Sequence, residues 1–158
     1  MKASEVIRII VFSLIGALAM FWLQPLIYRS RWTGFILTDV RLEPWLSNFY
    51  MTGATVVFAV SFVCTIIWYV LAAKAQIRDG KDAERWVLIW WVLLFPPVLS
   101  ICVAIGFFRG TDQALLSLTT FFLINILFLY WLTTATSSPG ALKFVPPGAF
   151  LVRRLFRD

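Results

Sequence analysis

Four long runs of apolar residues divide the chain, and none of them contains a charged side chain. They cover approximately residues 9–28, 49–73, 86–108 and 114–135. As helices, runs of this length are long enough to cross about 30 Å of hydrocarbon. Only helices and closed barrels satisfy their backbone in lipid, and the period-two alternation of barrel strands is missing. The pattern therefore predicts four transmembrane helices. The first run also exceeds the apolar core of a signal peptide, so we expect it to be retained.

The charged residues lie in the segments between and beyond these runs. Ten Lys and Arg residues fall in the N-terminus, the second connection and the tail, whereas four fall in the first and third connections. An even number of spans places the first three segments on one side of the membrane. The positive-inside rule then predicts that both termini face the cytoplasm or its equivalent, an N-in/C-in topology. The expected fold is an all-α integral membrane protein with its four helices in a compact bundle.

The connections carry their own local signals. Residues 38–43 alternate between charged and apolar side chains, which predicts an interfacial connector, with partner docking on the outer face as the alternative. Pro44 should end this segment, and Trp45 should anchor it. In the second connection, Gly80 is expected to end the second helix and Asp82 to cap the third.

The tail is expected to be separate from the transmembrane domain of residues 1–135. Residues 136–140 read Thr-Ser-Ser-Pro-Gly, a helix-stopping sequence, so residues 136–158 form a basic tail on the cytoplasmic side. Within it, residues 149–157 predict a short amphipathic helix. Arg153, Arg154 and Arg157 are its expected membrane-surface contacts, on anionic headgroups. A disordered end that binds nothing is the alternative.

Composition supports a membrane location. Hydrophobic residues make up 61% of the 158 residues and charged residues 14%, and mean hydropathy is +0.86. The net charge of +6 lies in short gaps between apolar runs, which favours anionic lipids over nucleic acid as partners. Tryptophan and tyrosine residues gather near the ends of the runs, which predicts two interfacial belts. The belt residues are Tyr28, Trp32, Trp45, Tyr50, Trp68, Tyr69, Trp86, Trp90, Trp91, Tyr130 and Trp131.

Residues that carry chemistry are scarce. The four runs contain no Asp, Glu, Lys or Arg, and the chain has no histidine. Proton relays, metal centres and haem sites depend on such groups, so we predict no catalytic, metal-binding or cofactor-binding residue. Cys64 and Cys102 should differ in depth by roughly 12 Å. A disulfide needs Cα atoms within about 7 Å, so two free thiols are expected.

One amide and one pair of prolines stand out inside the runs. Asn125 lies near the middle of the fourth run, where hydrocarbon demands a partner for its amide. We expect a hydrogen bond to another helix, with a substrate or pigment contact as the alternative. Gln24 lies near the outer end of the first run, within reach of water. Pro96 and Pro97 predict a helix kink or a short unwound turn in the third run.

Small residues indicate close helix approach. Gly106 and Gly110 form a GxxxG pattern at the end of the third run, and Gly16 lies on a small-residue face of the first. Such glycines permit contact with a neighbouring helix, either within the chain or on a partner.

Taken together, these features favour a non-enzymatic accessory, assembly or scaffolding subunit of a larger membrane complex. The expected partners are other integral membrane subunits and anionic lipids, with a homo-oligomer left open. The expected location is a bacterial inner membrane or an organellar, thylakoid-type membrane. The alternatives are a small oligomeric channel or facilitator and a pigment- or lipid-binding protein. A channel predicts a water-accessible stripe of polar side chains, whereas a scaffold predicts that they are buried between helices.

Overall fold

Four long helices account for most of the residues that the computed structural model describes, which are residues 3–30, 37–76 and 79–155. The helices run Ala3–Arg29, Leu42–Lys74, Gly80–Phe108 and Asp112–Ser137, and all are long and apolar enough to cross a membrane. No strand occurs in these described segments. The prediction of four long apolar helices is confirmed, and each helix extends beyond its apolar run because polar or charged residues at its ends continue the same hydrogen-bonded turns.

Three of the four helices change their winding along their length. The first consists of α1 (Ala3–Leu18), the π-helical segment η1 (Ala19–Leu23) and α2 (Gln24–Arg29). The second consists of α3 (Leu42–Trp45), the π-helical η2 (Leu46–Tyr50) and α4 (Met51–Lys74). The third is α5 (Gly80–Phe108). The fourth consists of the 3₁₀ turn η3 (Asp112–Ala114), α6 (Leu115–Ile126), the π-helical η4 (Leu127–Leu132) and α7 (Thr133–Ser137).

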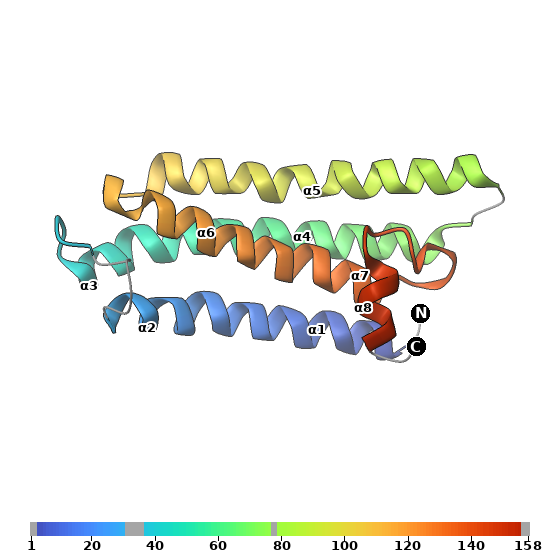
Figure 1. The fold of residues 1–158 in the computed structure, drawn as a ribbon, viewed down its shortest axis with the longest axis horizontal. Helices are drawn as coiled ribbons and strands as arrows, with labels where there is room; N and C mark the ends of the chain where they lie inside the picture. Colours follow the sequence, from blue (N-terminus) through green and yellow to red (C-terminus); the bar gives the residue numbers. More distant parts are fainter. Residues whose placement is uncertain (1–2, 31–36, 77–78, 156–158) are drawn as a thin grey trace.

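The helices lie side by side, with α4 and α6 between α1 and α5 (Figure 1). The start of α1, the α4–α5 connection and the end of α7 lie at the same end of the molecule (Figure 1). The short 3₁₀ turn η5 (Gly140–Leu142) and helix α8 (Ala149–Leu155) lie there too, and α8 packs against α7. We call this the α8 end, and the opposite end, formed by α2, α3 and η3, the α3 end.

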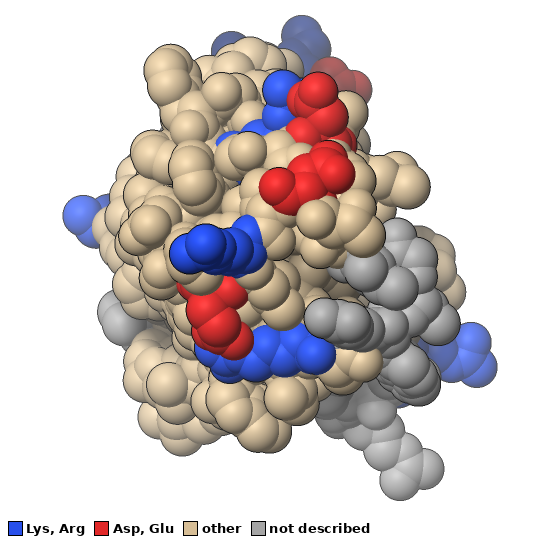
Figure 2. Space-filling view, turned by 90° about the vertical axis from the view of Figure 1, so that its left-hand side faces the viewer, with Lys and Arg blue, Asp and Glu red and all other residues tan. Residues whose placement is uncertain are grey.

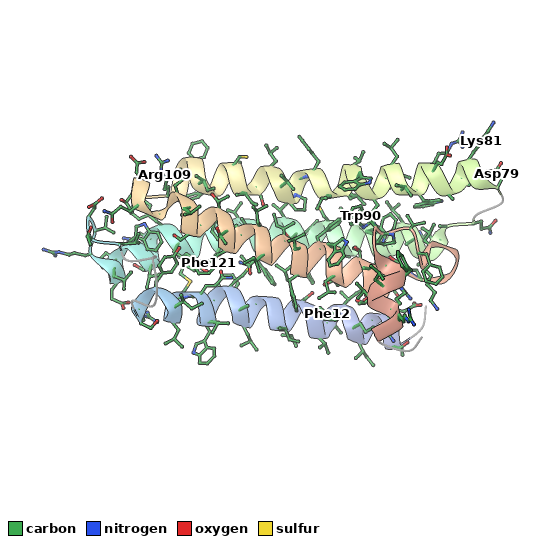
Figure 3. All side chains as sticks on the ribbon, in the orientation of Figure 1. Phe12, Asp79, Lys81, Trp90, Arg109 and Phe121 are labelled. Carbon is green, nitrogen blue, oxygen red and sulfur yellow. The ribbon has the colours of Figure 1, made fainter. Side chains whose placement is uncertain are left out.

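Aromatic side chains fill the space between the helices. Six residues assigned to interfacial belts are instead almost completely buried: Tyr28, Trp45, Tyr50, Trp68, Trp90 and Tyr130. The belt interpretation is wrong for these six because their polar atoms find partners inside the protein. Trp90, for example, extends from α5 and donates its indole N–H to Thr134 Oγ1 of α7 at 3.0 Å (Figure 3). Of the described tryptophans, Trp22 and Trp91 remain well exposed.

The connection between α4 and α5 differs from the prediction. Helix α5 already begins at Gly80, and Asp79 is its N-cap, with the carboxylate accepting a hydrogen bond from the Asp82 backbone N–H at 2.9 Å. Gly80 therefore does not end the second helix, and Asp82 is not the cap. Because the helix starts one turn earlier than the apolar run suggests, Asp82 occupies its third position, where an aspartate cap normally places its hydrogen bond.

The first connection is described only in part, since residues 31–36 lie outside the described segments. Asp39, Arg41 and Glu43 are exposed while Val40 and Leu42 are half-buried, as the alternation predicts. Pro44 does not end the segment, however. It lies in the first turn of α3, where a missing backbone N–H costs nothing because no intrahelical acceptor is available there.

Helix α5 continues through Pro96 and Pro97 without an unwound turn. Ser100, one turn further on, donates its hydroxyl to the Pro97 carbonyl at 2.5 Å. A packing bend at the two prolines stays a prediction.

Candidate functional site

A pair of buried amides joins the first and fourth helices. Gln24 Nε2 donates to Asn125 Oδ1 at 2.9 Å, and Asn125 Nδ2 donates back to Gln24 Oε1 at 3.0 Å. The side chains are 5% and 2% exposed, respectively. Asn125 thus faces another helix. Gln24, by contrast, does not rely on water, because it is buried and its amide is bonded to Asn125 and to the Tyr50 hydroxyl.

Tyrosine hydroxyls extend this polar contact. Tyr50 donates to Gln24 Oε1 at 2.7 Å and lies 2.8 Å from the Met20 carbonyl. Tyr28 donates to Ser117 Oγ at 2.8 Å, one turn closer to the α3 end. Met20, Gln24 and Tyr28 are spaced four residues apart, so the sequence places them on one helix face. That spacing was the signal that could have identified Gln24 as a core residue.

The three candidate packing glycines have different surroundings. Gly16 faces Leu129 of η4, and a Cβ at Gly16 would come within 2.9 Å of the Leu129 Cγ. A Cβ at Gly106 would have no described neighbour within 4 Å, so no described part of the chain packs on this glycine. Gly110 follows the end of α5 with φ +72°, a conformation that favours glycine, and lies against Trp45 and Phe49. Gly106 and Gly110 therefore do not form one helical GxxxG face.

A polar helix end is buried at the α8 end. Every residue from Thr133 to Ser138 is buried, and the helix stops at Ser137 as the sequence predicts. Trp68 donates its indole N–H to Ser138 Oγ at 2.8 Å, and Arg8 donates to the Thr136 carbonyl at 3.1 Å. The last carbonyls of a helix lack intrahelical donors, so Arg8 supplies the hydrogen bond that water cannot give to a buried carbonyl, while Trp68 pairs with the Ser138 hydroxyl.

Arg153 completes this arrangement from α8. Its Nε donates to the Ala135 carbonyl at 2.8 Å and its Nη2 to the Ser138 carbonyl at 2.6 Å. The residue is 6% exposed, so its assignment as a membrane-surface contact is wrong. The sequence shows the amphipathic pattern of α8 but not that α8 folds back over α7. Arg154 is exposed, and Arg157 lies outside the described residues.

The α3 end carries a mixture of acidic and basic side chains, which Figure 2 shows facing the viewer. Arg29 and Glu43 form two hydrogen bonds, at 2.9 and 3.0 Å, which tie α2 to α3. Arg109 and Asp112 form a second ion pair at 2.7 Å. These pairs are exposed and screened by solvent, so each stabilises the fold only slightly.

The described residues offer few groups for catalysis. Cys64 and Cys102 are both free, as predicted. Among the described residues, no three His, Cys, Asp or Glu side chains gather where they could hold a metal ion. No protein-family model, curated protein or solved structure matches this chain. Any functional interpretation therefore depends on the chain's own geometry.

Proposed function

We propose that this protein is a non-enzymatic accessory, assembly or scaffolding subunit of a larger membrane complex. In this proposal the four helices form a compact N-in/C-in bundle in a bacterial inner membrane or a thylakoid-type organellar membrane. Its partners are other integral membrane subunits and anionic lipids, and self-association into a homo-oligomer is one form that the complex can take.

The observation that carries the proposal is the separation of polar and apolar side chains. Among the described residues, every buried side-chain nitrogen or oxygen atom has a hydrogen-bond partner. The buried polar side chains of the described residues therefore find their partners within the protein, which supports burial between helices over the water-accessible stripe that a channel requires. The outward faces of α1 and α5 are large and apolar, with side chains such as Leu18 and Phe95 more than 60% exposed. Only lipid or another membrane helix suits such faces.

A site-specific crosslinking experiment tests this proposal. A photoreactive phenylalanine analogue is placed at Leu14 or Leu18 on α1 and at Phe95 on α5, with Phe122 as the buried control. In native membranes, we expect one discrete protein adduct, of the same identity at Leu14 and Leu18 because these residues are one turn apart. The control should yield only intrachain products, since Phe122 is enclosed by the protein.

Two outcomes contradict the proposal. The first is that every exposed position yields only lipid adducts while the tagged chain purifies alone and at monomer size. The second is that the purified chain, reconstituted in liposomes, carries an ion or small-solute flux that is absent from empty liposomes. The second result would favour the channel alternative.

A further inference from the structure

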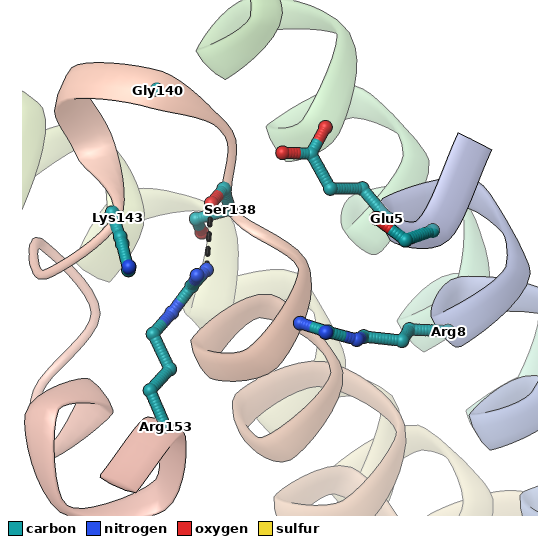
Figure 4. Close-up of a pocket in the computed structure, with 7 residues that line it drawn as sticks. Glu5, Arg8, Ser138, Gly140, Lys143 and Arg153 are labelled. Carbon is teal, nitrogen blue, oxygen red and sulfur yellow. Dashed lines mark hydrogen bonds between the residues drawn. The ribbon is translucent and has the colours of Figure 1, made fainter. Parts of the chain in front are cut away.

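Helix α8 packs against α7 and runs across the direction of the four long helices (Figure 1). Two contacts fix its level along the bundle. Arg153 donates to the carbonyls of Ala135 and Ser138, and Figure 4 shows the second of these hydrogen bonds. Just before α8, the Pro147 carbonyl accepts the indole N–H of Trp131 at 2.7 Å. The fourth apolar run ends among these residues, so α8 lies beside the end of a predicted span, where acyl chains give way to headgroups.

The inward face of α8 is fully used by the protein. Ala149, Val152 and Arg153 are spaced three and four residues apart, as one helix face requires, and they are 0%, 9% and 6% exposed. The only charged side chain of this face, that of Arg153, bonds the end of α7. The inward face therefore holds α8 in place across the bundle.

The outward face of α8 combines large apolar side chains with a cation. Phe150 and Leu151 are 62% and 59% exposed, and Arg154 is exposed on the same side. The connection before α8 repeats the combination, because Phe144 is also well exposed and the Lys143 ammonium lies 5.4 Å from the centre of its ring. Helices that lie in the membrane plane have this composition: the apolar side chains reach the acyl boundary and the basic ones the headgroups.

We propose that the outward face of α8 lies in the interfacial layer of the bilayer, with Phe150 and Leu151 at the acyl boundary and Arg154 at anionic headgroups. This inference deepens the proposed function. It rests on the same membrane location and names a face that contacts anionic lipid, but it needs no protein partner. Because Arg153 bonds the end of α7 from the opposite face, α8 ties that buried helix end to the membrane surface.

Fluorescence quenching of the full chain in vesicles of phosphatidylcholine and phosphatidylglycerol tests the proposal. A fluorescent amino acid that is excited apart from tryptophan replaces Phe150, Leu151, Phe95 or Lys81, one position at a time. Phe95 is exposed near the middle of α5 and reports on the hydrocarbon, whereas Lys81 is exposed in the first turn of α5, at the α8 end. The quenchers are a doxyl group near the lipid headgroup, a doxyl group near the end of the acyl chain, and iodide on both sides of the membrane.

We expect the probes at Phe150 and Leu151 to lose most of their fluorescence to the shallow doxyl group and little to iodide, because an interfacial helix lies about 5–10 Å into the boundary of headgroups and acyl chains. The probe at Phe95 should respond to the deep doxyl group, and the probe at Lys81 to iodide. The inference is overturned if the α8 probes respond like Lys81, which places α8 in water, or to no quencher, which places a protein against it. If Phe95 responds to iodide, the membrane location itself is wrong and the proposed function fails with it.

The contact of Arg154 with anionic headgroups is tested with the probe at Leu151. The shallow doxyl group is attached either to phosphatidylglycerol or to phosphatidylcholine, at equal mole fractions. One cation near an anionic surface gives about a fivefold preference, so phosphatidylglycerol should quench more strongly, and Arg154→Gln should remove this difference. The matched control, Lys81→Gln, removes a charge at the same end and should keep the difference. A preference that survives Arg154→Gln, or equal quenching by the two lipids before any substitution, would overturn the assignment of Arg154.

Discussion

Replacing Asn125 with leucine removes both amide hydrogen bonds between the first and fourth helices. Gln24 Nε2 then loses its acceptor, while Gln24 Oε1 keeps the Tyr50 hydroxyl at 2.7 Å. The variant should still insert, because insertion depends on the apolar runs and leucine makes the fourth run more apolar. We expect a protein with four helices and a lower free energy of unfolding.

The size of the effect follows from the geometry. A side-chain hydrogen bond between membrane helices contributes about 0.6 kcal/mol on average and up to about 1.7 kcal/mol. Two such bonds connect Gln24 and Asn125, and a buried amide left without a partner costs about 1–3 kcal/mol. Asn125→Leu should therefore lower the free energy of unfolding by about 1–3 kcal/mol. A double-mutant cycle with Gln24→Leu should give a coupling energy of about 1–2 kcal/mol.

Unfolding in mixed micelles with increasing dodecyl sulfate, followed by circular dichroism, measures these values. Thr120→Val is the matched control: the Thr120 hydroxyl donates to the Leu116 carbonyl of its own helix at 2.8 Å. It should change the free energy of unfolding by less than about 0.5 kcal/mol. If the effects of Gln24→Leu and Asn125→Leu add within about 0.4 kcal/mol, the amide pair contributes no coupling and the reasoning fails.

Three further predictions test other parts of the structure. Gly16→Ala should lower the free energy of unfolding by about 1–3 kcal/mol, because the added methyl group meets Leu129. Gly106→Ala should be neutral or stabilise the helix by up to about 1 kcal/mol. Equal effects of the two variants in the same unfolding assay would contradict this. Arg153→Ala should lower the thermal unfolding temperature in detergent, because it leaves two buried carbonyls without donors. The control Arg154→Ala changes an exposed residue and should leave that temperature unchanged. A larger decrease for Arg154→Ala than for Arg153→Ala rules out the capping role. In intact cells, an impermeant thiol reagent should label a cysteine at Arg41 but not one at Arg154; labelling at Arg154 refutes the N-in/C-in topology.

The four long apolar helices could be predicted because lipid imposes a simple rule on sequence. A helix that crosses the membrane needs about 20 consecutive apolar residues, and this requirement can be read from the sequence without knowing any tertiary contact. The ends of the helices were predicted less accurately. Asp79 rather than Asp82 caps α5, and Pro44 lies in the first turn of a helix rather than ending a connector. Both errors arose because charged and polar residues continue a helix beyond the apolar run.

Tertiary partners were harder to predict, because the same residue type serves two purposes in a membrane. Tryptophan near a span end is typical both of an interfacial anchor and of a buried donor, and only packing distinguishes the two. Trp68 is a buried donor because Ser138 lies opposite it. The same holds for Arg153, whose place in a short basic helix indicates a surface contact until α8 is seen to fold over α7. Sequence spacing alone contains no information on that fold-back.

The two ends of the molecule hold their arginine side chains in different ways, and the difference bears on how much each contributes to the fold. At the α3 end, Arg29 pairs with Glu43 and Arg109 with Asp112, so each of these cations has a carboxylate within 3 Å. At the α8 end, Arg8 and Arg153 donate instead to the backbone carbonyls of Thr136, Ala135 and Ser138, at the buried end of α7. The last carbonyls of a helix have no intrahelical donor, so a buried helix end depends on such side chains, whereas exposed ion pairs are screened by solvent. Arginine therefore contributes more to the fold at the buried helix end than in the exposed pairs of the α3 end.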